Sequence, residues 1–125
     1  MEVTVLISLY GLKQCSTSRR VEKAFNEAGV DYQFYDIREQ VPSKEDIKRA
    51  LESSDRPKQV FNTSGSAYRE KNLKDKIDDL SQEEIVDLLA SDGMLIKRPL
   101  VTDKEVATTG AKEDTVAYWI EKEGK

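Results

Sequence analysis

The chain contains no histidine, and its only cysteine is Cys15. Without histidine, the usual zinc sites, the cysteine–histidine nucleophile pair and the serine–histidine–aspartate triad are excluded in their ordinary forms. A single cysteine cannot form an internal disulfide, which is typical of a protein in the reducing cytosol. We therefore expect a cytoplasmic protein without a metal site, in which any catalysis depends on Cys15, carboxylates, lysines, arginines, hydroxyls or backbone groups.

Long hydrophobic runs and an excess of positive charge are also missing. The sequence has no stretch of about 18 apolar residues, so we expect no contact with a membrane, and its N-terminus lacks the pattern of a signal peptide. The net charge of −4 argues against direct nucleic-acid binding, since phosphate binding favours a basic surface. With 125 residues, of which 38% are hydrophobic, the chain is expected to form one domain over residues 1–125.

The hydrophobic pattern predicts strands that alternate with helices. Val3–Tyr10 is rich in β-branched and apolar residues and predicts a buried strand. After Cys15 the apolar residues follow helical spacing, and Gly29 is typical of a helix C-cap. Tyr32–Ile37 predicts a second strand. A strand–helix–strand order of this length favours a parallel pair with a right-handed crossover.

Residues 42–91 differ in character from the segments on either side. Ser43 is a candidate N-cap for one helix, and Ser81 with Glu84 forms the pattern of a capping box for another. The residues between these two helices are mostly polar and interrupted by proline and glycine. We interpret residues 42–91 as a helical insertion that packs beside the sheet and is not a separate domain.

The last third of the chain predicts strands again. Met94–Val101 is apolar but contains Pro99, so we expect this strand to be interrupted or to lie at an edge of the sheet. A turn leads from there to a strand over Glu105–Thr108, which Gly110 ends. A final helix is predicted from about Lys112.

Cys15 lies where the first predicted strand gives way to a helix. The first turn of a helix leaves backbone N–H groups unpaired and carries a positive partial charge, which favours the reactive thiolate form of a cysteine. The same N–H groups can bind an anion. Lys13 and Arg19 would add positive charge to this loop, and Ser18 can donate to the thiolate or help to cap the helix. We predict a reactive thiol beside an anion-binding site.

These residues carry a resemblance. A strand that ends in Tyr10-Gly-Leu-Lys-Gln-Cys15, a helical insertion, the run Ile96-Lys-Arg98-Pro99 and a glycine before the last helix together resemble the ArsC/Spx/YffB family. The resemblance covers nearly the whole chain. It implies an α/β fold, namely a thioredoxin-like mixed sheet flanked by helices, with a helical insertion subdomain. It also implies that the Arg98–Pro99 peptide bond is cis and lies next to the cysteine.

The resemblance further implies a mechanism. In the family's arsenate reductases, the cysteine attacks the arsenic atom while arginines hold the oxyanion, glutathione attacks the product and a glutaredoxin completes the reduction. By position, Cys15 would be the nucleophile, and Arg19 and Arg98 would bind a small oxyanion or thiol substrate, with Ser18, Pro99 and Gly11 as supporting residues. We expect no tightly bound cofactor, glutathione as a co-substrate and glutaredoxin as a partner.

The sequence also departs from these reductases. Gly11 stands where they have a histidine, and the arginines expected near Asn62 and near Thr109 or Gly110 are absent. Each charge-assisted contact is worth about 1.5–3 kcal/mol, so the loss of two weakens oxyanion binding considerably. We therefore predict a thiol oxidoreductase that uses glutathione or glutaredoxin as reductant, with Lys13 and Asn62 as further substrate-binding candidates, and arsenate reduction as the alternative.

A second alternative comes from the Spx branch of the same family, whose members bind RNA polymerase and sense oxidation through a Cys-x-x-Cys pair. Here the corresponding residues are Cys15 and Ser18. A serine cannot close a disulfide, so this redox switch is excluded in this chain. RNA polymerase is a partner only under this alternative.

Overall fold

A mixed sheet of four strands forms the centre of the protein, whose computed structural model describes residues 7–124. The strands are β1 (Ser8–Gly11), β2 (Gln33–Asp36), β3 (Leu100–Thr102) and β4 (Ala107–Thr109). Their order in the sheet is β2-β1-β3-β4, with β1 and β2 parallel and the other pairs antiparallel. The predicted parallel pair is confirmed, although the start of the predicted strand at Val3 lies outside the described residues.

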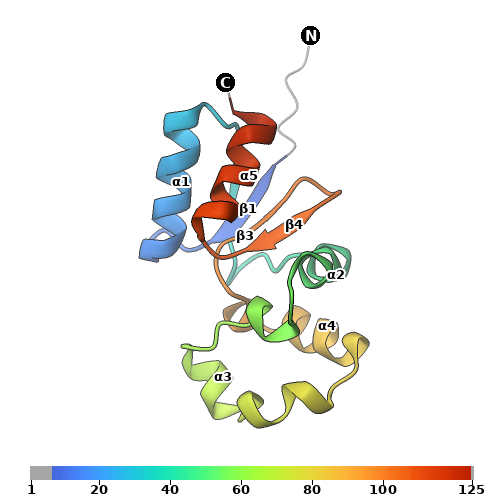
Figure 1. Cartoon of the computed structure of the whole chain (residues 1–125). Coiled ribbons are helices and arrows are strands. Elements are labelled where there is room, and N and C mark those ends of the chain that lie inside the picture. The colour runs from blue at the N-terminus through green and yellow to red at the C-terminus, as the bar shows by residue number, and fades with distance from the viewer. Residues whose placement is uncertain (1–6, 125) are drawn as a thin grey trace.

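Helices cover both faces of this sheet (Figure 1). Helices α1 (Ser16–Ala28) and α5 (Glu113–Glu123) lie side by side on one face. Residues 42–91 supply α2 (Lys44–Ser53), which contacts β4, together with α3 (Ser66–Glu70), α4 (Gln82–Ser91) and three short 3-10 helices. Among residues 7–124, no helix has both the length and the apolar character needed to cross a membrane.

The helix ends follow the capping patterns of the sequence. Gly29 ends α1 with a φ of 75°, a left-handed conformation that favours glycine. The Ser43 hydroxyl accepts a hydrogen bond of 3.2 Å from the Asp46 N–H at the start of α2. At the start of α4, Ser81 and Glu84 form both hydrogen bonds of a capping box. These local predictions are confirmed because a cap needs only neighbouring residues.

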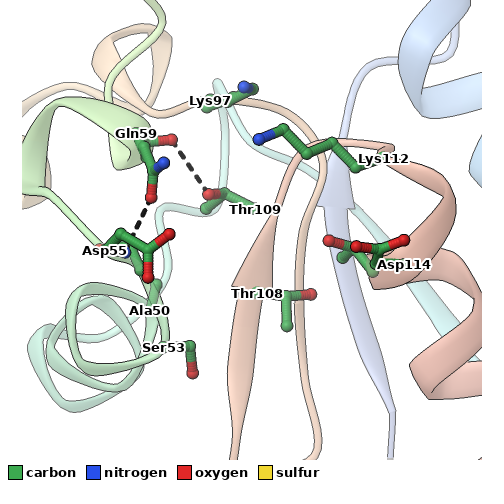
Figure 2. A pocket seen from close by; sticks show the side chains of 11 residues that line it. Ala50, Ser53, Asp55, Gln59, Lys97, Thr108, Thr109, Lys112 and Asp114 are labelled. Carbon is green, nitrogen blue, oxygen red and sulfur yellow. Dashed lines mark hydrogen bonds between the residues drawn. The ribbon is translucent and has the colours of Figure 1, made fainter.

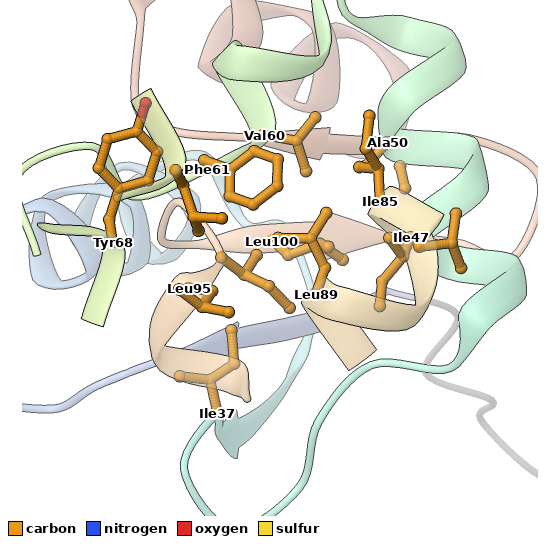
Figure 3. Packing of buried hydrophobic residues seen from close by; sticks show 14 of the residues in the cluster. Ile37, Ile47, Ala50, Val60, Phe61, Tyr68, Ile85, Leu89, Leu95 and Leu100 are labelled. Atoms are coloured by element: carbon orange, nitrogen blue, oxygen red, sulfur yellow. The ribbon is translucent and has the colours of Figure 1, made fainter. Parts of the chain in front are cut away.

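Two hydrophobic clusters hold the layers together, one on each face of the sheet. Strand β1 contributes to both, because successive side chains of a strand point to opposite faces. Leu9 packs with Phe25 of α1 and Trp119 of α5 in the smaller cluster, whereas Tyr10 packs against the larger one, which contains Ile47 of α2. Figure 3 shows the larger cluster, in which side chains of the helical insertion meet Leu100 of β3.

The strand predicted over Met94–Val101 is interrupted, as its proline indicated. Gly93–Leu95 forms a 3-10 helix, and strand β3 begins only after Pro99. The alternative of an edge position is wrong for β3, which lies between β1 and β4. The Arg98–Pro99 peptide bond is cis, as the resemblance implied, and Gly110 follows β4 with a φ of 85°.

A close approach between backbones fixes the segment that leads into β3. A Cβ atom added to Gly93 would lie 2.1 Å from the carbonyl oxygen of Ile37, just after β2. Only glycine fits against this carbonyl, since a backbone atom cannot move aside as the tip of a side chain can. The contact holds the 3-10 helix that carries Met94, whose sulfur accepts a hydrogen bond of 3.6 Å from the Arg98 guanidinium.

We expect Gly93→Ala to lower the free energy of unfolding by about 2 kcal/mol or more, within the usual range for overpacking. Gly65→Ala is the matched control, because the nearest atom to its Cβ, at 2.7 Å, belongs to the flexible side chain of Asn62. Urea unfolding followed by circular dichroism measures both variants. Equal losses of stability in the two variants would contradict the role of the Gly93 contact.

Candidate active site

The candidate nucleophile lies in a tight turn between β1 and α1. Its backbone N–H donates to the Leu12 carbonyl oxygen at 3.1 Å, which closes the turn. Cys15 is the N-cap of α1, with φ −82° and ψ 120°, and its carbonyl oxygen accepts the Arg19 N–H at 3.0 Å. The cysteine is half-buried and its thiol is free. The predicted position at the N-terminus of a helix is therefore correct.

Ser18, one turn further along α1, connects the helix to this loop. Its side chain is fully buried, and its hydroxyl oxygen accepts a hydrogen bond of 3.3 Å from the Leu12 N–H. A hydroxyl that accepts in this way still has its own hydrogen to donate. The Ser18 hydroxyl is also one of the groups that lower the pKa of the Cys15 thiol. Ser18 therefore has two roles, because it orders the loop through the Leu12 N–H and lowers the pKa of the thiol.

Gly11 allows Ser18 to take this position. A Cβ atom on Gly11 would lie 2.6 Å from the Ser18 hydroxyl oxygen and 3.0 Å from its Cβ atom. Any larger residue at the end of β1 would push Ser18 away from both the Leu12 N–H and the sulfur. Gly11 occupies the position where the arsenate reductases of the family have a histidine. In this chain a larger residue would collide with Ser18, which explains the glycine.

Opposing influences set the pKa of the Cys15 thiol. Partial burial raises it, but interactions with the Ser18 N–H and hydroxyl, the Arg98 side chain and the Thr17 N–H lower it to about 7. The sulfur makes no cap hydrogen bond of the usual geometry, so its contacts with the N–H groups are looser than those of Ser43 and Ser81. Together these groups keep a large fraction of the thiol ionised near neutral pH.

Arg98, next to the cis peptide bond, is another group that lowers the pKa of the Cys15 thiol. Its guanidinium donates to the Met94 sulfur at 3.6 Å. Its Nε atom is buried and has no hydrogen-bond partner among residues 7–124. Pro99, which follows, is held by the Gly110 N–H, which donates to its carbonyl oxygen at 3.1 Å. Arg98 therefore contributes a positive charge and an N–H group, on Nε, that is free to donate a hydrogen bond.

Arg19 differs from the sequence-based prediction. Its guanidinium lies on the exposed outer face of α1, beside Glu22 and Lys23, and is not among the main influences on the Cys15 pKa. The reason is the phase of the helix, since each residue turns about 100° from the one before. Ser18 occupies the direction that faces the loop, so the next residue turns away.

Lys13 also points elsewhere. Its ammonium group pairs with a Glu22 carboxylate oxygen at 3.0 Å and lies 4.1 Å from the centre of the Phe34 ring, while 68% of its side chain stays exposed. The Tyr32 hydroxyl donates to the same carboxylate oxygen at 3.0 Å. The charge of Lys13 is thus engaged on the side of β2, which differs from the predicted place beside the substrate.

Asn62 lies in the loop after the 3-10 helix Pro57–Val60. Its N–H donates to the Leu95 carbonyl oxygen at 2.8 Å, and its own carbonyl oxygen accepts the Gly65 N–H at 3.1 Å. Its side chain is half-buried and lines a pocket together with Lys97. Asn62 therefore belongs to the surroundings of the segment that carries Arg98.

The structure adds residues that the sequence did not single out. Met94 contacts the Arg98 guanidinium through its sulfur. Lys97 and Lys112 direct their ammonium groups toward the same part of a neighbouring pocket, opposite Gln59 and Thr109 (Figure 2). No local pattern marks these residues, because they come from segments that only the fold brings together.

With this geometry in place, comparison with known proteins identifies the family. The model of the ArsC family matches residues 10–118. The chain belongs to the ArsC family. The match includes the cysteine loop, the helical insertion and the Arg98–Pro99 segment, so the resemblance seen in the sequence is confirmed.

Several known proteins are similar to this chain over most of their length. YusI of Bacillus subtilis (strain 168) is 49% identical over 86% of this chain and 92% of its own. A possible arsenate reductase from Streptococcus mutans UA159, known from a crystal structure, has 40% sequence identity with this chain. The two structures superpose with a TM-score of 0.80 over 90% of this chain and 98% of the other chain. The global transcriptional regulator Spx of Lactiplantibacillus plantarum is 24% identical over 92% of this chain and 86% of its own. The mixed sheet with helices on both faces is thus the ArsC-type, thioredoxin-like fold.

Replacing Ser18 by alanine should raise the pKa of Cys15 toward its ordinary value, because the sulfur loses the hydroxyl that interacts with it. A rise from about 7 to about 8 would slow alkylation by iodoacetamide at pH 7 about fivefold, since the thiolate fraction falls from one half to one tenth. The dependence of the alkylation rate on pH measures this pKa. An unchanged profile in a folded variant would contradict the role of Ser18.

The lowered pKa of Cys15 should also appear in the stability of the protein. Folding lowers this pKa from 9.0 to about 7, so the thiolate stabilises the folded state fully above pH 9, and this contribution is lost as the pH falls from 9 through 7. The difference in free energy of unfolding between the wild type and Cys15→Ser should therefore shift in favour of the wild type from pH 7 to pH 9. Urea unfolding under reducing conditions at several pH values measures it, and a constant difference would show that the thiol has an ordinary pKa.

Proposed function

We propose that this protein is a thiol oxidoreductase in which Cys15 exchanges with glutathione-type disulfides. The observation that carries the proposal is a half-buried thiol at the N-terminus of α1 with a pKa of about 7, with Ser18 and Arg98 beside it. A thiol that is ionised near neutral pH, and not buried in an apolar core, is the form that attacks disulfides. A reducing compartment such as the cytoplasm would keep it in this form.

The reaction proceeds in two exchanges. The thiolate of Cys15 attacks the glutathione sulfur of a mixed disulfide, the sulfur–sulfur bond of the substrate breaks, and the other half leaves as a thiolate. Cys15 then carries glutathione in a new disulfide. A second glutathione, or a glutaredoxin, attacks this glutathione sulfur and releases the Cys15 thiolate, so two electrons pass from the reductant to the substrate.

The neighbours of the sulfur have definite tasks in this scheme. Arg98 and the N–H groups of Thr17 and Ser18 stabilise negative charge on Cys15, both in the attacking thiolate and when Cys15 departs. The absence of a second cysteine means that the resolving thiol must come from another molecule. This requirement supports glutathione or glutaredoxin as the reductant.

Arsenate reduction is the second candidate, and the 40% identity with the possible arsenate reductase of Streptococcus mutans favours it. Too few guanidinium groups surround the sulfur for this reaction. Arg98 is the one arginine that lowers the thiol pKa, Arg19 points outward, and the positions near Asn62 and Gly110 lack arginine. A tetrahedral oxyanion needs several converging donors, so this site suits an exchanging disulfide better.

A regulatory role is the third candidate, supported by the 24% identity with the transcriptional regulator Spx. It would require binding to RNA polymerase without a disulfide switch, because Ser18 replaces the second cysteine. Recovery of RNA polymerase on immobilised protein, equally for wild type and Cys15→Ser, would favour this role over thiol exchange.

Incubation with oxidised glutathione tests the proposal directly. We expect mass spectrometry to detect one glutathione adduct on Cys15 in the wild type and no adduct in Cys15→Ser. Arg98→Gln should slow adduct formation about tenfold, since one charge-assisted contact of at least 1.4 kcal/mol is lost. Arg19→Gln is the matched comparison and should change the rate less than twofold, because its guanidinium lies on the outer face of α1.

Two results would overturn the proposal. The first is a wild type that forms no adduct above the level of Cys15→Ser. The second is arsenate turnover with glutathione and glutaredoxin in the absence of any disulfide exchange, which would make arsenate reduction the function.

A further inference from the structure

Met94 is a half-buried residue in the middle of the 3-10 helix Gly93–Leu95, which leads toward Arg98. Its side chain packs against the larger hydrophobic cluster, and so does the side chain of Cys15. The two residues are 79 positions apart in the sequence. The fold therefore places a second sulfur-containing side chain against the same buried residues as the candidate nucleophile.

The register of the sheet brings the segment with Met94 and Arg98 to the same end as the cysteine turn. Strands β1 and β3 are antiparallel neighbours, and Tyr10 lies opposite Leu100. In an antiparallel pair, the residues that follow one strand leave the sheet where the residues that precede the other strand enter it. The turn over residues 11–15 and the segment over residues 94–99 therefore share one end of the sheet.

The contact between Met94 and Arg98 is unusual among the arginines of this chain. The Met94 sulfur accepts a hydrogen bond of 3.6 Å from an Nη atom of the Arg98 guanidinium. Within residues 7–124 no carboxylate pairs with Arg98, whereas Arg38 and Arg49 both pair with aspartates. A thioether thus takes the place that a carboxylate has at the other two arginines.

A thioether and a carboxylate differ in what they do to the charge of an arginine. A carboxylate would orient the guanidinium, but it would also neutralise much of its charge in a partly buried site. The sulfur of methionine is uncharged, polarisable and a weak acceptor. It can therefore orient the guanidinium and leave the positive charge available. This matters because Arg98 is the only charged group among the main influences on the Cys15 pKa.

Backbone contacts fix the segment on both sides of Arg98 but leave its long side chain free to choose an orientation. The Met94 N–H donates to an Asp92 carboxylate oxygen at 2.9 Å. The Lys97 N–H donates to the Val60 carbonyl oxygen at 2.8 Å. The Met94 sulfur is thus held in a defined place, from which it restrains the guanidinium of Arg98.

We propose that Met94 is a positioning residue, whose uncharged sulfur holds the Arg98 guanidinium in the orientation that acts on Cys15 without neutralising its charge. Met94 itself makes and breaks no bond. This inference rests on the proposed function, in which Arg98 stabilises Cys15 as it attacks and as it departs. An uncharged acceptor at position 94 is then sufficient, an apolar residue of the same size is not, and a carboxylate is worse than either.

Three substitutions at position 94 separate the effects of acceptor, size and charge. Met94→Leu conserves the volume, which a core tolerates best, but removes the acceptor. It should raise the Cys15 pKa from about 7 to about 7.5 and slow alkylation by iodoacetamide at pH 7 about twofold. Met94→Gln restores an uncharged acceptor and should rescue the rate. Met94→Glu supplies a carboxylate and should slow alkylation about fivefold, as expected for a pKa of about 8.

The matched control is the same change in a protein that lacks the guanidinium. In Arg98→Gln there is no positive charge for Met94 to orient, so adding Met94→Leu should leave the pH profile of alkylation unchanged. A methionine that served only to fill space would shift the profile equally in both backgrounds. Thermal unfolding verifies that each variant is folded.

Alkylation requires no disulfide, so these profiles separate the inference from the proposed function. Identical profiles for the wild type and Met94→Leu, equal shifts in both backgrounds, or faster alkylation of Met94→Glu would each overturn the role of Met94. Adduct formation with oxidised glutathione would then still support thiol exchange. The expected profiles in a protein that forms no glutathione adduct would do the reverse, because Met94 would orient Arg98 in a protein with another function.

Discussion

The contact between Gly11 and Ser18 is the constraint on which the candidate site depends. It brings the end of β1 so close to the first turn of α1 that a Cβ atom on Gly11 would lie 2.6 Å from the Ser18 hydroxyl oxygen. In this position the hydroxyl accepts the Leu12 N–H and contributes to the lowered pKa of the Cys15 thiol. One small residue in a strand therefore determines the environment of a thiol in the following helix.

The hydrophobic clusters turn this local arrangement into a rigid one. Phe25 anchors α1 on one face of the sheet, and Leu100 anchors β3 on the other, beside the residues of the helical insertion. The segment with Arg98 is held between them, since Gly93 packs against Ile37 and the Gly110 N–H bonds to Pro99. Arg98 and Cys15, 83 positions apart in the sequence, meet because both ends of this frame are fixed by packing.

The distribution of charge distinguishes the thiol from its surroundings. One guanidinium, that of Arg98, lowers the pKa of the thiol, and its buried Nε atom has no hydrogen-bond partner among the described residues. Of the other basic residues in this part of the chain, Lys13 pairs with a carboxylate, Arg19 points outward from α1, and Lys97 lines a neighbouring pocket.

The sequence by itself determined the features that depend on neighbouring residues. Helix caps at Ser43 and Ser81 and the place of Cys15 at the start of α1 were predictable, because each needs only a few consecutive residues. The family resemblance supplied the fold and the cis bond before Pro99. Only the tertiary structure decided that Arg19 turns outward and that Lys97 and Lys112 line one pocket. The first depends on which residue of the helix meets β1, and the second on packing that joins distant segments, and a linear pattern contains neither.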